Sequence, residues 1–480
     1  MDSYNVVNKW IDQNSTPLLD LSDKIWSFSE MKFEEYKSAD ATKKIMKENG
    51  FEIHENVAGL ETAFICSYGS GSPVIGFLGE YDALDGLSQQ ADVFHRSNEG
   101  SDLSGHGCGH NLLGASCALA VIAIKEYMIN NRLEGTIKLF GCPGEEGGSG
   151  KTFMAREGIF DDLDAAITWH PKNQNSVTNS SSLANIQSKF RFKGKSAHAG
   201  GAPHLGRSAL DAVELMHVGV NYLREHVIQD ARLHYAITNT GGVSPNVVQA
   251  DAETVHYVRA PEMSAVNSIY ERVCNIARGA ALMTDTSVEI EIIKATSNTI
   301  INSTLNRVMD QVYSELGEIS YNADDYEYAN KYMETLSEED IKHVINVVKR
   351  NMTTENFMQN KETLMNSSLL PFHVTLKERE VVRKGSTDVA DVSWIVPTVQ
   401  AGVVCYAKGT PGHSWQKVAQ GKSSIAKKGL IYSSKVMALT ALKLLDNPLI
   451  LEAAKRELQN RVGPTGYICP IPENVFPSKI

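Results

Sequence analysis

The pattern of hydrophobic and polar positions divides the chain into a helical start and a longer region in which strands and helices alternate. Over roughly the first 60 residues, Leu18, Leu21 and Ile25 recur at helical spacing, and Gly50 is typical of a helix end. Short apolar runs bounded by glycine then predict buried strands, with a long helix from Leu112 to Met128 among them. These strands are Thr62 to Cys66, Pro73 to Leu78, Thr136 to Phe140 and Ala165 to Trp169. Such alternation indicates an α/β domain with a mainly parallel sheet flanked by helices.

The pattern changes after Leu183 to the order strand, helix, strand, strand, helix, strand. This order is the ferredoxin-like, split βαβ pattern. The predicted strands are 185–192, 234–240, 250–258 and 287–293, and the predicted helices are 208–223 and 264–282. We therefore predict an inserted α+β domain over 185–297, between the two parts, 1–184 and 298–480, of a discontinuous first domain. The stretch from Ser320 to Asn366 is rich in charged and amide residues and suggests no role.

Composition narrows the class of protein. With 480 residues, 42% hydrophobic and 21% charged, the chain is long enough for two globular domains. No uninterrupted apolar run of about 18 residues predicts a membrane span, and the polar N-terminus does not resemble a secretory signal. The net charge of −11 argues against general nucleic-acid binding. Seven scattered cysteines, an odd number, fit a reducing cytoplasm better than a disulfide framework.

Polar side chains follow three of the predicted parallel strands. Asp82 follows the second strand, Glu145 and Glu146 follow the third in a glycine-rich turn, and His170 ends the fourth. Ligands of parallel α/β sheets bind just beyond the carboxyl ends of the strands. The site is therefore expected at this edge of the sheet.

The motif Gly105-His106-Gly107-Cys108-Gly109-His110-Asn111 opens the long helix. Thiolate and imidazole are ligands suited to zinc, and glycines allow the backbone to turn tightly around an ion. The alternative is a glycine-rich turn with an incidental thiol, because one Cys-x-His pair is only half a site.

Glu145 and Glu146 suggest one metal-bound carboxylate and one proton carrier, with an exposed acidic turn as the alternative. His170 and His413, each alone, would more often be ordinary solvated side chains. Their conjunction with the other groups is more informative, because five ligands with one bridging group can hold two ions and leave positions open for water. The proposed ligands are Cys108, His110, Glu146, His170 and His413.

The run Gly148-Ser149-Gly150-Lys151-Thr152 resembles a phosphate-binding loop. The full motif, Gly-x-x-x-x-Gly-Lys-Ser/Thr, requires glycine where this chain has Glu145. Two glutamates would also repel a phosphate at a helix N-terminus. We therefore reject a nucleotide-hydrolysing function.

The inserted domain has candidate groups of its own. His198 lies among small residues, which favours a presented side chain, although a flexible turn with a solvated histidine is equally compatible. Asn246 and Arg259 are expected near the edges of neighbouring strands. An arginine there could grip a substrate carboxylate with its two-pronged guanidinium, and a surface salt bridge is the alternative.

These motifs together resemble the metal-dependent aminoacylase and carboxypeptidase G superfamily, along nearly the whole chain. They are Cys108-Gly109-His110-Asn111, Gly144-Glu145-Glu146-Gly147-Gly148, His170-Pro171 and Lys195-Ser196-Ala197-His198-Ala199-Gly200. Within the superfamily, the run from Ser386 to Trp394 and the total length are most similar to the B-type subunit of p-aminobenzoyl-glutamate hydrolases. Two departures leave the substrate preference open: Asp85 stands where many relatives have proline, and Asn111 where aminoacylase-type relatives have an acid.

The resemblance implies a role for each residue. It implies two divalent ions, zinc or manganese, with Cys108 as a bridging thiolate and His110, Glu146, His170 and His413 as the other ligands. Glu145 would be the general base and Asp82 a carboxylate behind the ligands. His198 would enter the active site of a partner subunit and stabilise the oxyanion, and Asn246 and Arg259 would bind substrate. The inserted domain would be a lid and dimerisation domain.

The sequence thus predicts an amidohydrolase that cleaves the amide bond to an amino acid with a free carboxylate, p-aminobenzoyl-glutamate or a similar N-acyl amino acid. The expected partners are a small-molecule substrate and another protein chain, which would be either an identical copy or a homologue. A dipeptidase acting on β-alanyl or related dipeptides is the alternative within the same chemistry. A non-catalytic partner subunit is the alternative of another class, and it is disfavoured because every ligand and the base are present.

Overall fold

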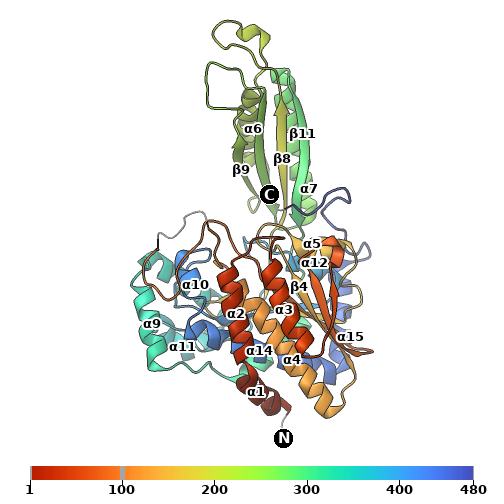
Figure 1. Ribbon diagram of the computed structural model, residues 1–480, viewed down its shortest axis with the longest axis vertical. Helices are drawn as coiled ribbons and strands as arrows, with labels where there is room; N and C mark the ends of the chain where they lie inside the picture. Colours follow the sequence, from red (N-terminus) through yellow and green to blue (C-terminus); the bar gives the residue numbers. More distant parts are fainter. Residues whose placement is uncertain (1–2, 98–102, 479–480) are drawn as a thin grey trace.

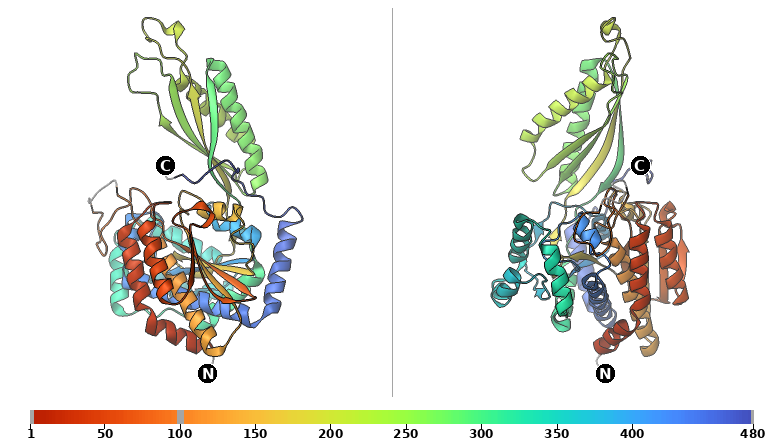
Figure 2. Two further views of the ribbon diagram at one scale, coloured as in Figure 1. Left: turned by 45° about the vertical axis from the view of Figure 1, so that its right-hand side comes forward. Right: turned by 60° about the vertical axis from the view of Figure 1, so that its left-hand side comes forward.

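The computed structural model describes residues 3–97 and 103–478 and consists of a broad body and a narrow arm that rises from it (Figures 1 and 2). The described chain begins in the body and ends in a segment that lies against the base of the arm, and the arm itself is an insertion within the body. This arrangement confirms the predicted fold class, an α/β unit with a mainly parallel sheet and a separate antiparallel α+β unit.

The body is built around one sheet of eight strands. They are β1 (Glu52–Glu55), β2 (Phe64–Ser70), β3 (Val74–Glu80), β4 (Gly135–Cys142), β5 (Ala165–Lys172), β6 (Asn175–Val177), β12 (His373–Val374) and β14 (Thr398–Val404). Their order is β1-β2-β4-β3-β5-β14-β6-β12, and the four strands from β4 to β14 in this order are parallel. Helices cover both faces of the sheet, which is why its central strands are nearly continuous apolar runs.

The central helix of the body is α4 (His110–Asn131). By length and composition it is apolar enough to cross a membrane, but 83% of its apolar window is buried inside the molecule. It packs against β3, and the indole N–H of Trp169 in β5 donates to the Leu113 carbonyl at 3.1 Å. Helix α4 is therefore the core helix of the body.

The other body helices surround α4 and the sheet (Figure 1). They are α1 (Ser3–Asn14), α2 (Thr16–Phe28), α3 (Tyr36–Glu48), α5 (Gly150–Arg156), α8 (Ser303–Leu316), α12 (Val389–Ile395), α13 (Trp415–Ala419), α14 (Ser424–Asp446) and α15 (Pro448–Val462), with a short 3-10 turn, η1 (Val57–Gly59). Helices α2 and α14 pack directly on α4. The predicted stop after α3 is present, since Gly50 has a φ of +77°.

The arm has the predicted strand and helix order. Its elements are β8 (Ala184–Lys193), α6 (Ala209–Leu223), β9 (Arg232–Asn239), β10 (Asp251–Ala260), α7 (Met263–Thr284) and β11 (Ser287–Thr296), with the 3-10 turns η2 (Pro203–Leu205) and η3 (Arg224–His226). The strands pair antiparallel in the order β11-β8-β10-β9. Burial alternates along β10 because α6 and α7 cover one face of this sheet. Arg259 lies inside β10 rather than just past its end, because the strand ends two residues later than expected.

The stretch from Ser320 to Asn366, which suggested no role, is mostly helical. It contains α9 (Ala323–Met333), α10 (Glu338–Asn351) and α11 (Thr354–Asn366). Asn322, Ser337 and Thr353 cap these helices through their side-chain oxygens. Tyr332 and Leu364 are buried in the small apolar core of this region. Most of the charged residues therefore occupy the solvated faces of amphipathic helices, whereas Asp325 is buried and pairs with Lys428.

Candidate metal centre

Chain segments far apart in sequence bring the predicted ligands to one edge of the body sheet. Cys108 and His110 lie at the start of α4, Glu146 follows β4, and His170 lies near the end of β5. His413 lies in the loop after β14, with a φ of 52°. The parallel strands thus place these groups together, as the strand-end rule predicts.

The five side chains form two overlapping groups of donor atoms. Within each group the donor atoms lie within 4.8 Å of one another. One group is Cys108, His110 and His170, and the other is Cys108, Glu146 and His413. The sulfur of Cys108 is 3.2 Å from Nε2 of His170. Because Cys108 belongs to both groups, it occupies the place expected of a bridging ligand.

Asp82 holds two of these residues, His110 and Glu146, in position. Its Oδ1 lies 2.8 Å from Nδ1 of His110, and its Oδ2 accepts the backbone N–H of Glu146 at 2.9 Å. Burial alone would raise the pKa of Asp82, but the His110 imidazole and these hydrogen bonds lower it overall. A histidine ligand held through its other nitrogen by a carboxylate is the usual arrangement in metal sites.

The donor set fits divalent metal ions. Nε2 of His110 lies 3.2 Å from Oε2 of Glu80, and it lies 4.0 Å from Oε1 of Glu146, which is buried without a hydrogen-bond partner. The latter separation suits one ion between His110 and Glu146, because metal–nitrogen and metal–oxygen bonds are each about 2.0–2.2 Å. Burial and Glu146 raise the pKa of the Cys108 thiol to about 12, so this thiol becomes a thiolate only beside a cation. Burial also lowers the pKa of His170, which keeps its imidazole neutral and able to bind metal.

Glu145 differs from Glu146 in its surroundings. One of its oxygens belongs to a third group of donors with Glu80 and His110. Burial, together with Glu80, Glu146 and Asp388, raises the pKa of Glu145 well above its usual range. A carboxyl group in this environment can carry a proton near neutral pH.

The sequence reasoning missed a buried ionic network next to Glu145. Nζ of Lys151 lies 2.7 Å from Glu80 and 2.6 Å from Asp388, and all three side chains are buried. The pKa of Lys151 is raised: burial lowers it, but the two carboxylates more than offset that effect. Lys151 belongs to the run that resembled a phosphate-binding loop, and its partners are carboxylates of the protein itself. The sequence did contain a signal for this network, namely a lysine in an apolar helix together with acidic residues at strand ends.

Two cavities meet at Glu145 and Glu146. One, of about 300 Å³, is lined by Cys108, His170 and His413 as well. The other, of about 220 Å³, reaches the arm and is lined by Arg259 and Lys294. The structure therefore brings Arg259 to the cluster of predicted ligands, in the same chain.

His198 and Asn246 lie elsewhere. Strand β8 runs from the body to the far end of the arm, and both residues lie in the exposed loops at that end (Figure 1). The backbone N–H of Ala199 donates to the Asn246 carbonyl at 2.9 Å, and His198 forms an isolated bridge with Val247. These two predicted site residues are thus close to each other but not to the ligands of their own chain.

Comparison with known proteins places the chain in a family. The profile of peptidase family M20/M25/M40 matches residues 76–354. The chain belongs to this family. The matched residues include the ligands up to His170, Glu145 and the whole arm.

Relatives with named activities match the chain to different extents. The B-type subunit of the p-aminobenzoyl-glutamate hydrolase of Escherichia coli is 45% identical over 480 residues, which is 99% of both chains. The Xaa-Arg dipeptidase of Mus musculus is 26% identical and covers 94% of this chain and 90% of its own. The A-type subunit of the same Escherichia coli hydrolase is 28% identical over 47% of this chain and 53% of its own.

Solved structures of the family share the fold. A dinuclear metal-binding peptidase of the M20 family from Bacillus subtilis has a TM-score of 0.54 at 18% identity, covering 90% of this chain and 98% of its own. An aminobenzoyl-glutamate utilization protein from Klebsiella pneumoniae has a TM-score of 0.57 at 15% identity, covering 88% of this chain and 98% of its own. The M20 fold therefore extends over about nine-tenths of the chain.

Proposed function

We propose that the chain is a two-metal amidohydrolase that cleaves the amide bond between an acyl group and an amino acid with a free carboxylate, with p-aminobenzoyl-glutamate as the first candidate substrate. The observation that carries the proposal is the convergence of five donor side chains around Cys108, with Glu145 beside them. The 45% identity to one subunit type of a p-aminobenzoyl-glutamate hydrolase, along 99% of both chains, supports the substrate.

The proposed ions are zinc or manganese. Cys108 would bridge them, and His110, Glu146, His170 and His413 would complete their protein ligands. When bound, a pair of such ions supplies an activated water and polarises the scissile carbonyl. Mixed sulfur, nitrogen and oxygen donors favour zinc.

Glu145 is the proposed proton carrier. It accepts a proton from the attacking water and donates it to the nitrogen of the leaving amine. Its raised pKa supports this role, because a general base works best when its pKa lies near the working pH. Asp82 holds His110 and the Glu146 backbone in place while the proton moves.

Arg259 is the proposed partner of the carboxylate on the amino-acid half. Its guanidinium carbon lies 4.0 Å from the centre of the Tyr257 ring, and its Nε is buried without a hydrogen-bond partner. A stacked guanidinium with free donors is well suited to bind a carboxylate. Its position in the cavity next to Glu145 supports this role.

His198 and Asn246 are proposed to act in the active site of a partner protomer. Asn185 lines the cavity near Glu145, and the strand from Asn185 to Lys193 rises about 3.3 Å per residue, so His198 is roughly 26 Å or more from that cavity. A partner chain can present its own arm tip to this site. That partner is either a second copy or a homologue, since both subunit types of the Escherichia coli hydrolase are similar to this chain.

A dipeptidase is the second candidate. The 26% identity to a Xaa-Arg dipeptidase over 94% of the chain favours it. A non-catalytic partner subunit is disfavoured because all five donors and Glu145 are present and converge. For either enzyme we propose a cytoplasmic location, which the seven unpaired cysteines support.

A hydrolysis panel tests the proposed function. Metal-loaded protein is assayed with p-aminobenzoyl-glutamate, N-acetyl-glutamate, N-benzoyl-glycine, β-alanyl-lysine and β-alanyl-arginine. The proposal predicts the highest kcat/KM for an acyl amino acid. A preference for the dipeptides would replace the proposal with the second candidate, and no hydrolysis by the chain alone or with a homologous partner would refute both.

A further inference from the structure

The cavity of about 300 Å³ is lined by a second pair of basic residues, besides the pair in the cavity of Arg259. Arg259 and Lys294 line one cavity, and Lys172 and Arg383 line the other. Both cavities share Glu145, Glu146 and His413. Each cavity next to the glutamates therefore has an arginine in its lining, Arg259 in one and Arg383 in the other.

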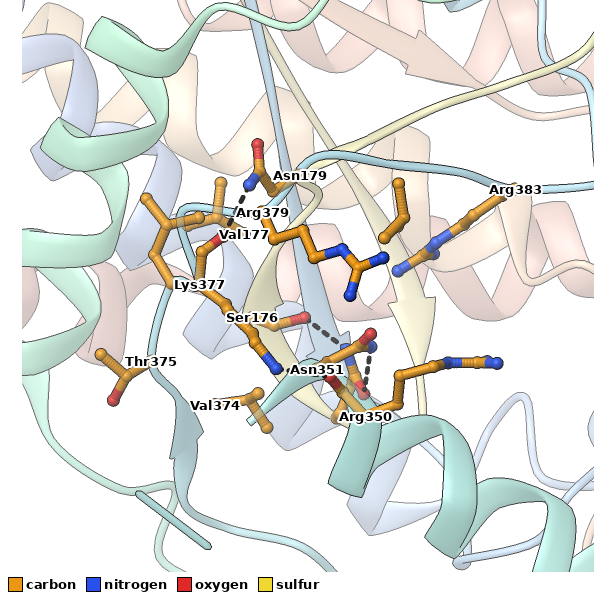
Figure 3. Close-up of a pocket in the computed structure, with 13 residues that line it drawn as sticks. Ser176, Val177, Asn179, Arg350, Asn351, Val374, Thr375, Lys377, Arg379 and Arg383 are labelled. Carbon is orange, nitrogen blue, oxygen red and sulfur yellow. Dashed lines mark hydrogen bonds between the residues drawn. The ribbon is translucent and has the colours of Figure 1, made fainter. Parts of the chain in front are cut away.

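Arg383 also borders a third pocket, of about 180 Å³, which we call the arginine pocket (Figure 3). Arg350, Arg379 and Lys377 line it together with Arg383, and its lining residues include no aspartate or glutamate. Figure 3 shows the side chains of Arg379 and Arg383 extending from opposite sides into this pocket. Among the described residues, no carboxylate forms an ion pair with Arg350, Arg379 or Arg383.

The backbone fixes Arg383 at this border. The short strands β7 (Ser180–Ser181) and β13 (Val381–Val382) pair in parallel, and the backbone N–H of Arg383 donates to the Ser181 carbonyl at 2.8 Å. Ser180, Ser181 and Ser182 line the cavity of about 300 Å³. This contact therefore ties the arginine to the wall of the metal-site cavity.

The acidic residues of the same loop are engaged elsewhere. Glu378 pairs with Arg307 at 3.5 Å, and an oxygen of Glu380 accepts a hydrogen bond from Arg461 at 3.1 Å. The side-chain charges alternate in sign from Lys377 to Glu380, and the two glutamates have partners outside the pocket. The charge of the arginines that face the pocket is thus left without compensation by the protein.

Uncompensated cations that face one pocket favour an anionic ligand. Burial and the nearby Arg350 both lower the pKa of Arg383, so its charge is disfavoured by its surroundings when no anion is bound. The whole chain is negatively charged, with a net charge of −11, so these arginines are a local exception. A carboxylate bound to a guanidinium through two parallel hydrogen bonds would relieve this repulsion.

We propose that the arginine pocket binds the side-chain carboxylate of a dicarboxylic amino acid, with Arg383 making the direct contact. This inference rests on the proposed function and extends it. Glutamate has two carboxylates, and a substrate of this type would place one near Arg259 and the other near Arg383. The second site explains how the protein would select an acyl-glutamate over an acyl amino acid with a neutral side chain.

The test compares two substrates that differ in one charge. They are p-aminobenzoyl-glutamate and p-aminobenzoyl-glutamine, which share the same acyl group and the same α-carboxylate. Arg383→Gln is expected to lower kcat/KM for the glutamate substrate by about 10- to 100-fold, mainly through KM, because a charge-assisted hydrogen bond is lost. The glutamine substrate should change by less than about threefold. Arg379→Gln should act in the same direction but more weakly, and Arg456→Gln, on the exposed surface of α15, should change neither.

A binding measurement separates this inference from the proposed function. Glutarate has two carboxylates and no amide bond, so its affinity can be measured by calorimetry even if the protein hydrolyses nothing. Arg383→Gln should weaken glutarate binding by about tenfold or more, and butyrate binding by much less. An equal loss with both acids, or no loss with glutarate, would overturn the assignment, as would an equal loss of activity on both substrates.

Discussion

Asp82 contacts two of the candidate metal ligands at once, with Oδ1 2.8 Å from the His110 imidazole and Oδ2 accepting the Glu146 backbone N–H at 2.9 Å. His110 starts α4 and Glu146 follows β4, so one buried carboxylate sets the relative position of a helix end and a strand end. The spacing of these two candidate ligands therefore depends on a residue that need not touch a metal itself.

Asp82→Asn should weaken metal binding without unfolding the protein. The asparagine amide is uncharged and has only one oxygen, so it cannot replace both contacts of Asp82, to the His110 imidazole and to the Glu146 backbone N–H. Loss of such a supporting group typically lowers metal affinity by about 10- to 100-fold. Competition with a fluorescent chelator measures the affinity. Asp85→Asn, three residues along and exposed, is the matched control and should bind metal as the parent does. Equal affinities for the two variants would show that Asp82 does not support the ligands.

The two neighbouring glutamates should separate into a base and a ligand. Glu145→Gln should abolish turnover, because the amide cannot carry the proton, while metal content stays near that of the parent. Glu146→Gln should instead lose metal, because a ligand is removed. Metal analysis and activity assays on both variants provide the measurement, and the opposite pattern would mean that the two roles are exchanged.

His198→Ala should keep its metal and lose about 100-fold or more in rate, as is typical when one oxyanion donor is removed. His204→Ala is the matched control, since His204 is also exposed at the tip of the arm, and it should remain active. Mixing His198→Ala with Glu145→Gln should restore part of the activity, because a hybrid dimer contains one complete site. If the protomers exchange and activity does not return, each site is built from a single chain.

The arm should lose stability in mild acid because of His256. This buried histidine packs against Phe190 and His217, and burial lowers its pKa to about 3. In the unfolded chain its pKa is about 6.5, so the unfolded state binds the proton first as the pH falls. The contribution of His256 is therefore complete above about pH 6.5 and is lost as the pH falls toward 3.

The expected loss between pH 7 and pH 5 is about 1–2 kcal/mol of unfolding free energy. His256→Phe should reduce the drop in melting temperature over this interval, whatever its effect at pH 7. His54→Asn, at an exposed position, should leave the drop unchanged. A drop in His256→Phe as large as in the parent would assign the acid sensitivity to other groups.

Most of the fold could be predicted because each signal was local. The apolar run from Pro73 to Leu78 corresponds to β3. The strands and helices of the arm follow the predicted order, because burial on one face makes apolar residues recur at a regular spacing along each element. The convergence of the candidate ligands could be predicted for the same reason, since their motifs are short and lie at strand ends or at the start of a helix. Strand and helix ends shifted by a few residues, which put Arg259 inside β10.

The parts that could not be predicted depend on distant partners. Lys151 is buried by its contact with Asp388, which is 237 positions further along the chain. Arg383 faces a pocket only because β13 pairs with β7, some two hundred positions earlier in the sequence. No local pattern distinguishes such residues from surface lysines and arginines. The stretch from Ser320 to Asn366 suggested no role for another reason, since the helical spacing of Ile341, Val344, Ile345 and Val348 indicates an amphipathic helix and not a function.

The most direct test of the central claim is metal stoichiometry measured together with activity. We expect about two divalent ions per chain in the active protein, loss of turnover on p-aminobenzoyl-glutamate after dialysis against a strong chelator, and recovery when zinc or manganese is returned. The chelated protein should stay folded, because the apolar core around α4 does not depend on the ions. Turnover that persists unchanged in protein shown to be free of metal would contradict the account.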